Sequence, residues 1–392
     1  MKYLIIKIST LLICSNILSG CEFIEDDNDT ETESGPVAAN VRAVVTTIAS
    51  DYSAGAFSLI TGDSDRIAYN ELLPTHSDIT VNTFNNDIYV VEKFSGNNIS
   101  RFNLDDLNAP VWQYSTQDSP TSAIASNPKQ VVFLNETKAY ILRYGSNTVW
   151  IVNPSATLSD NFKIGEIDLS SYADTDGIAE VRMGVIANGK LFIAMQRLEN
   201  FAPTQTAYVA IIDTTTDLEI DAGIAGDNLS GIPLTIKNPN SSMQYIAAND
   251  SIYIQGIGSY NDGEFIGGIE RIDLSDYSTN VVIDDGTSVS HPNEKVAAMA
   301  IVSPTLGYYI SYVEWGNTSI YQFNPTTGAE IQTSVATLMS GDFSSLAVDG
   351  NGLVWVSDVA NATVHIIDPV NDDLVDSVST GLPPHEIGFV NQ

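Results

Sequence analysis

The chain has 392 residues, with 16 Lys and Arg against 49 Asp and Glu, which gives a formal charge of −33 at pH 7. A surface this acidic repels phosphate backbones, so we expect no nucleic-acid partner. Cys14 and Cys21 are the two cysteines, which excludes disulfides, Cys-ligated zinc and iron–sulfur clusters from the remainder of the chain.

The N-terminus reads as an export signal. Lys2 and Lys7 flank the start of an apolar run that ends in Leu18-Ser19-Gly20-Cys21, and this order is typical of a secretory signal. The ending resembles the lipobox of bacterial lipoproteins. The resemblance implies that residues 1–20 are removed and that Cys21 is acylated, palmitate included. It also implies a lipid anchor in the cell envelope, with the outer membrane favoured and its periplasmic or surface side open.

An acidic segment follows this cysteine. Residues 22–33 contain seven acids and no base. Runs of like charge repel one another and stay extended and disordered. We therefore expect residues 21–40 to be the acylated Cys and an acidic tether, and residues 41–392 to be a single domain.

The body of the chain is a repeat. An apolar strand with a central aromatic residue recurs at intervals of 46 to 61 residues, and the next strand ends in Asn or Asp. Four short strands per unit, marked once by an aromatic residue, indicate a β-propeller. The central aromatic residues are Tyr89, Tyr140, Phe192, Tyr253, Tyr309 and Trp355.

The two ends of the chain supply one more unit. Six units are complete between residues 77 and 380, and a single strand follows at 385–390. Three strands are predicted near the start, over 43–48, 57–60 and 66–69. Pairing the C-terminal strand with these three closes the ring and leaves no free sheet edge. We expect an all-β, seven-bladed β-propeller of four-stranded blades. Six or eight blades remain alternatives.

The last unit carries a family resemblance. Residues 354–358 and 364–369, Val-Trp-Val-Ser-Asp and Val-His-Ile-Ile-Asp-Pro, resemble the YVTN-type propeller repeat and are similar to NHL and quinoprotein-like propellers. The resemblance covers residues 41–392, although the Asn of the YVTN phrase is replaced in every unit. It implies the fold and a ligand site on the face around the central channel. It implies no particular ligand, because propellers support unrelated functions.

Candidate binding residues follow the second strands or lie in the turns between blades. One interpretation is that their cations neutralise neighbouring carboxylates. The other is a polar pocket with aromatic walls for an anionic or glycan-like ligand. The candidates are Glu92, Lys93, Arg143, Tyr144, Glu180, Arg182, Gln196, Arg197, Gln255, Tyr312, Trp315, Asp358 and His385.

One loop resembles calcium-binding loops. Asp174, Asp176 and Glu180 flank a turn-forming Gly177, and spaced carboxylates can wrap a hard cation. The EF-hand spacing fails, however, because Met183 stands where the bidentate Glu is required. The loop is either a possible calcium site or a solvated turn, and no other cofactor is indicated.

Catalytic motifs are sparse. The sequence has no G-x-S-x-G elbow, Gly-rich phosphate loop or H-E-x-x-H motif. We therefore predict a non-enzymatic envelope lipoprotein whose propeller binds a protein partner or an extracellular ligand at its channel face. The alternative is a metal-dependent lyase or hydrolase of sugars or lactones that uses His385 and nearby carboxylates. A third hypothesis is a cofactor-bearing dehydrogenase similar to quinoproteins.

Overall fold

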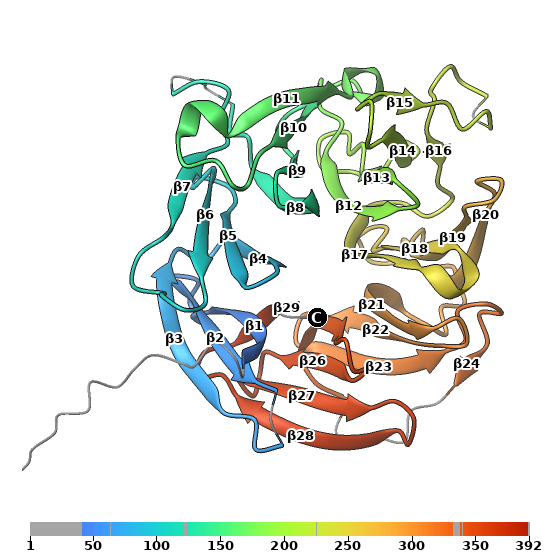
Figure 1. Cartoon of the computed structure of the whole chain (residues 1–392). Coiled ribbons are helices and arrows are strands. Elements are labelled where there is room, and N and C mark those ends of the chain that lie inside the picture. The colour runs from blue at the N-terminus through green and yellow to red at the C-terminus, as the bar shows by residue number, and fades with distance from the viewer. Residues whose placement is uncertain are drawn as a thin grey trace, which may run out of the picture. The chain divides into compact units, whose positions relative to one another are not determined.

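The computed structural model describes residues 41–390, except residues 63, 121, 123, 225, 332–337 and 339. Their strands form seven sheets arranged as the blades of a propeller around a central axis (Figure 1). The predicted all-β, seven-bladed architecture is confirmed. Cys21 and the predicted tether lie outside the described residues. Within them, no helix has the length and apolarity needed to span a membrane.

Six blades are each built from consecutive strands, and the first strand of each lies innermost. From the centre outward, the first blade consists of β4 (Ile79–Phe84), β5 (Asp87–Glu92), β6 (Asn98–Asn103) and β7 (Trp112–Ser115). The second blade consists of β8 (Pro128–Asn135), β9 (Lys138–Arg143), β10 (Thr148–Val152) and β11 (Lys163–Asp168). The third blade consists of β12 (Val181–Ala187), β13 (Lys190–Met195), β14 (Tyr208–Asp213) and β15 (Glu219–Ile220), and β16 (Ile232–Pro233) also pairs with β14.

The next three blades repeat the same order. They are β17 (Pro239–Ile246), β18 (Ser251–Gly256), β19 (Gly268–Asp273) and β20 (Thr279–Asp284); β21 (Lys295–Ser303), β22 (Leu306–Glu314), β23 (Asn317–Phe323) and β24 (Glu330–Ile331); and β25 (Phe343–Val348), β26 (Val354–Asp358), β27 (Thr363–Asp368) and β28 (Asp373–Ser379). In the described part of the chain, short 3₁₀ helices lie in connections between strands, at Ser159–Asn161, Ser170–Tyr172 and Ala247–Asn249.

The seventh blade combines both ends of the domain, as predicted. Its innermost strand is β29 (Pro384–Phe389), followed outward by β1 (Val41–Ile48), β2 (Gly55–Thr61) and β3 (Ala68–Thr75). Figure 1 shows β1 in blue beside β29 in red. Ala43 pairs with Phe389 and Val45 with Ile387, so the ring is closed by backbone hydrogen bonds between the first and last strands.

The repeated aromatic residues fill the space between blades. Each central aromatic of a second strand is at most 2% exposed, and side chains from two neighbouring blades form each of the large apolar clusters. Trp355 meets Phe389 of the seventh blade edge to face at 5.5 Å. The repeat therefore marks the contacts that hold one blade against the next.

The two faces of the ring differ in which loops they carry. Each innermost strand begins at the face that holds the loops between second and third strands and the connections between blades. We call this the mouth face. Strand β1 runs the other way, because Thr47 near its end pairs with Pro384 at the start of β29. The chain therefore enters the propeller at Val41 from the opposite face.

Candidate functional site

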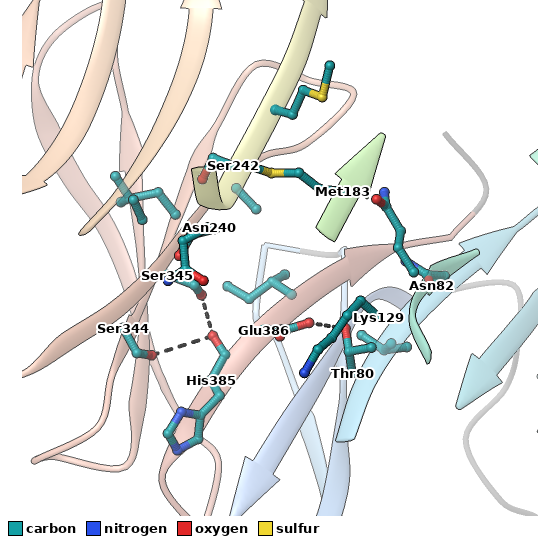
Figure 2. Close-up of a pocket in the computed structure, with 18 of the residues that line it drawn as sticks. Thr80, Asn82, Lys129, Met183, Asn240, Ser242, Ser344, Ser345, His385 and Glu386 are labelled. Atoms are coloured by element: carbon teal, nitrogen blue, oxygen red, sulfur yellow. Dashed lines mark hydrogen bonds between the residues drawn. The ribbon is translucent and has the colours of Figure 1, made fainter. Parts of the chain in front are cut away.

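A polar cavity of about 550 Å³ opens at the mouth face and is lined by all seven innermost strands (Figure 2). A second cavity of about 470 Å³ continues toward the opposite face. The two share Asn82, Gln130, Gly184 and Met243, so they form one channel along the propeller axis.

Side-chain amides bridge neighbouring innermost strands in this channel. The amide oxygen of Asn82 accepts the backbone N–H of Val131 at 2.8 Å, and that of Gln130 accepts the N–H of Gly184 at 2.8 Å. Gln244 accepts the N–H of Ile301 in the same way, at 2.8 Å. Since only oxygen can accept from a backbone N–H, the amide orientations are fixed. Their NH₂ groups have no hydrogen-bond partner among the described residues and remain available to a ligand.

Two cations of the cavity have no carboxylate partner among the described residues. The Nε of Arg182 donates to Asn240 Oδ1 at 3.2 Å, which leaves both terminal nitrogens of its guanidinium uncommitted. Lys129 Nζ lies over the ring of Tyr144, 5.0 Å from its centroid. A third cation, Lys93, does pair with Asp78 at 3.2 Å. The cavity thus holds two positive groups that an anion could neutralise.

Burial and charge crowding act together on Lys129. Burial is the main cause that lowers its pKa to about 8, and the positive charges of Arg182 and Lys93 lower it further. Burial also lowers the pKa of His385, whose ring lines the same cavity. Burial therefore disfavours the positively charged forms of Lys129 and His385, and a bound anion would stabilise these forms.

The cavity also contains a carboxylate. Glu386 accepts a hydrogen bond from the Thr80 hydroxyl, and the carbonyl of His385 accepts one from the Ser345 hydroxyl (Figure 2). Glu386 makes no ion pair with Lys129 or Arg182, although its negative charge acts to raise the pKa of both, and both side chains line the cavity. With two unpaired cations against one carboxylate, the cavity is locally positive in a chain of net charge −33.

Of the predicted binding residues, Lys93, Arg182 and His385 line the cavity. Four others bond to neighbouring groups in the blades. Arg143 is fully buried and pairs with Asp118 at 2.6 Å. Arg197 donates to the backbone carbonyls of Tyr172 and Thr206. Two more, Gln196 and Gln255, are also buried and donate to the backbone carbonyls of Pro239 and Val296.

The remaining predicted residues lie around the mouth face or within a blade edge. Glu92 accepts a hydrogen bond from Thr75, and Asp358 is bonded to His365 at 3.2 Å. The ring of Tyr312 meets Tyr260 edge to face at 6.1 Å. The rest are Tyr144 under Lys129, Trp315, which is 75% exposed, and Glu180, whose carboxylate accepts the N–H of Leu198 at 2.9 Å.

The predicted calcium loop forms a turn stabilised by its own carboxylates. Asp174 Oδ1 accepts the N–H of Asp176 at 3.0 Å, and Asp176 Oδ1 accepts the N–H of Ile178 at 3.0 Å. Burial raises the pKa of Glu180 to about 7. Across the described part of the chain, no three His, Cys, Asp or Glu side chains are grouped to hold a metal ion. Calcium binding stays a prediction.

Sequence reasoning missed most of the channel lining. Lys129, Gln130 and Asn240 come from the first residues of innermost strands, not from the ends of second strands. Glu386 has the same position and is one of the carboxylates near His385 that the enzyme alternative included. The missed signal is a proline followed by polar residues. Pro128, Pro239 and Pro384 each begin an innermost strand, where proline is tolerated.

Comparison with known proteins supports the fold alone. No family model matches the chain, and no curated protein matches it. A Lactobacillus plantarum protein is similar in structure with a TM-score of 0.59 and 13% identity, covering 90% of this chain and 100% of its own. A Bacteroides fragilis candidate 6-phosphogluconolactonase has a TM-score of 0.58 and 11% identity, covering 92% and 99%. The hydrazine synthase of Kuenenia stuttgartiensis has a TM-score of 0.54 and 12% identity, covering 78% and 86%.

Proposed function

We propose that this protein is a lipid-anchored envelope lipoprotein whose YVTN-like propeller is a binding module, and that its channel takes up an anionic group. The observation that carries the proposal is the pair of unpaired cations, Lys129 and Arg182, in the 550 Å³ cavity. A planar guanidinium with free terminal nitrogens suits a carboxylate, which it can bind through two parallel hydrogen bonds.

The strand register gives the approximate length of the ligand. Val132 pairs with Tyr140 and Val185 with Phe192, whereas Asn82 pairs with Tyr89 at the same level of the propeller. Lys129 and Arg182 each precede that level by three residues. Bulges beside Lys129 and Arg182 reduce the separation to between two and three pairing steps, so their backbones lie roughly 7–10 Å along the channel from that of Asn82. A carboxylate with acceptor oxygens further along its chain fits this spacing.

Removing both cations should abolish anion binding. We expect Lys129→Gln with Arg182→Gln to weaken glucuronate binding by at least about 100-fold, because each charge-assisted hydrogen bond contributes about 1.5–3 kcal/mol. Isothermal titration calorimetry with glucuronate, and with neutral glucose as the reference sugar, measures the difference.

The matched control is Lys163→Gln, since Lys163 lies on an outer strand and pairs with Glu166 at 2.7 Å. Its glucuronate affinity should equal that of the wild type. Unchanged affinity in the double variant would contradict the channel site. Turnover of a sugar lactone by the wild-type protein would instead support the alternative of a lyase or hydrolase.

The anchor has its own test. Replacing Cys21 with Ala should abolish incorporation of labelled palmitate in the bacterial host and move the protein from the membrane to the soluble fraction, because a thiol is needed to carry the lipid. Cys14 lies within the predicted signal peptide, so the control substitution Cys14→Ala should leave palmitate incorporation intact. Labelling that persists in Cys21→Ala would refute the lipoprotein assignment.

A further inference from the structure

Exposed aromatic side chains gather on one face of the propeller. Five aromatic residues stand out by their exposure in the described part of the chain, and each lies in the loop between the second and third strands of its own blade. All five therefore project from the mouth face. They are Tyr52, Phe94, Phe201, Tyr260 and Trp315, with exposed fractions of 51, 62, 87, 63 and 75%.

The opposite face lacks this feature. Its exposed apolar side chains in the described residues are aliphatic and lie in loops between third and fourth strands, as do Val111, Leu218 and Val370. Aromatic residues are enriched in protein interfaces and dominate their energy, whereas scattered aliphatic residues on a surface are ordinary. The asymmetry marks the mouth face as an interaction surface.

The spread of these aromatic residues sets the size of what binds there. They come from the blades that contain β2, β6, β14, β19 and β23, which lie on different sides of the channel (Figure 1). A ligand small enough for the 550 Å³ cavity cannot reach all of these loops. Only a macromolecule that covers the mouth can contact them together.

We call the five exposed aromatic residues the aromatic rim. The side chains of the rim and its surroundings favour a protein partner over a polysaccharide. Phe94 and Phe201 carry no polar group, and the same face exposes the aliphatic Ile124 at 64% and Val289 at 91%. Sugars stack on aromatic faces but gain little from aliphatic side chains, which pack best against other apolar side chains. The rim thus resembles the apolar part of a protein–protein interface.

Charge adds a second requirement. The cations of the channel lie at the centre of this face, while its loops carry acids that include Asp176, Asp262 and Glu264. A complementary partner has a carboxylate at its centre and basic residues around it.

We propose that the mouth face docks a protein that covers the aromatic rim and inserts one carboxylate, from a side chain or a C-terminus, between Lys129 and Arg182. This rests on the proposed function, because it identifies the anionic group of the channel as part of a protein. The rim supplies apolar contact area and the channel supplies selectivity for the acid.

Site-specific photo-cross-linking in living cells of the host tests the docking surface. A photoreactive phenylalanine replaces Phe94, Phe201 or Trp315 in the full-length chain, one position at a time. Val370, 87% exposed on the opposite face, is the matched control for Phe201, which is also 87% exposed. We expect one protein-sized adduct at the three mouth positions and none at Val370. Adding Lys129→Gln and Arg182→Gln should reduce its yield by about 10-fold or more.

Each other outcome overturns a defined part of the proposal. Adducts absent from all three mouth positions, or equal at Val370, refute the docking surface. Adducts that a glycosidase removes and a protease leaves intact identify a polysaccharide and refute a protein partner. Yield unaffected by the channel substitutions refutes carboxylate insertion. If glucuronate fails to bind while channel-dependent adducts form, the small-ligand form of the proposed function fails and the docking surface stands.

Discussion

Ending the chain at His385 should abolish the folded propeller. The deletion removes most of β29, and with it the backbone pairing to β1 and the contact between Trp355 and Phe389. The seventh blade then loses its innermost strand and exposes an unpaired edge, which promotes aggregation. The deletion also removes Val390, which is 1% exposed, and losing this buried side chain alone is expected to cost about 1.5–3 kcal/mol, a large share of the stability of a domain. Loss of a cooperative thermal transition, with aggregation on gel filtration, is the expected result.

Two control variants distinguish the effect of losing the closing strand β29 from the effect of shortening the chain. A chain ended at Val390 keeps β29 and should melt like the wild type. A circular permutant that joins Val390 to Val41 by a short turn, with new ends opened at Gly381, should also fold. The register makes this possible, because Ala43 and Phe389 are directly paired. Normal melting of the chain ended at His385 would show that β29 is dispensable.

Replacing Lys129 with Met should stabilise the free protein while weakening anion binding by about 10-fold or more, because one charge-assisted hydrogen bond is lost. Burial, with the nearby charges of Arg182 and Lys93, lowers the pKa of Lys129 to about 8, so the folded protein disfavours the charged form that prevails at pH 7. Methionine keeps the apolar stem and removes the charge. Each pKa unit corresponds to about 1.4 kcal/mol, and allowing for partial solvent access we expect a gain on the order of 2 kcal/mol.

The pH dependence identifies the cause. Because the folded pKa lies below the unfolded value near 10.4, the destabilisation is complete below about pH 8 and disappears as pH rises toward 10.4. The stability advantage of Lys129→Met should therefore shrink over that range, as measured by urea unfolding midpoints. The outer-strand control Lys163→Met should show no such gain. A destabilised Lys129→Met at pH 7 would mean that the lysine is compensated in the free protein.

The fold could be predicted because a propeller repeats its core. Tyr140, Phe192 and Tyr253 are buried at equivalent positions in successive blades and fill equivalent spaces between blades. Because each of these spaces requires a large apolar side chain, an aromatic residue recurs in the sequence once per blade. The closing strand was predictable for a related reason, since a lone strand at 385–390 and three unpaired strands at the start complete one another.

The channel could not be predicted in the same way, because binding residues are not repeated. Lys129 in β8 and Arg182 in β12 have no counterparts that repeat in every blade. Which residues of an innermost strand line the channel also depends on strand register and on bulges, such as the register shift between Val181 and Met183. Residues after second strands were poor guides. Arg197, for example, adopts a left-handed φ of 52°, and its guanidinium bonds the backbone carbonyl of Tyr172.

The direction in which the chain enters the propeller has a topographical consequence. Val41 lies at the face opposite the mouth, so the chain enters the domain there and not among the loops that surround the channel opening. Because this point of entry and the aromatic rim are on opposite faces of the ring, a partner that covers the mouth would not collide with the start of β1.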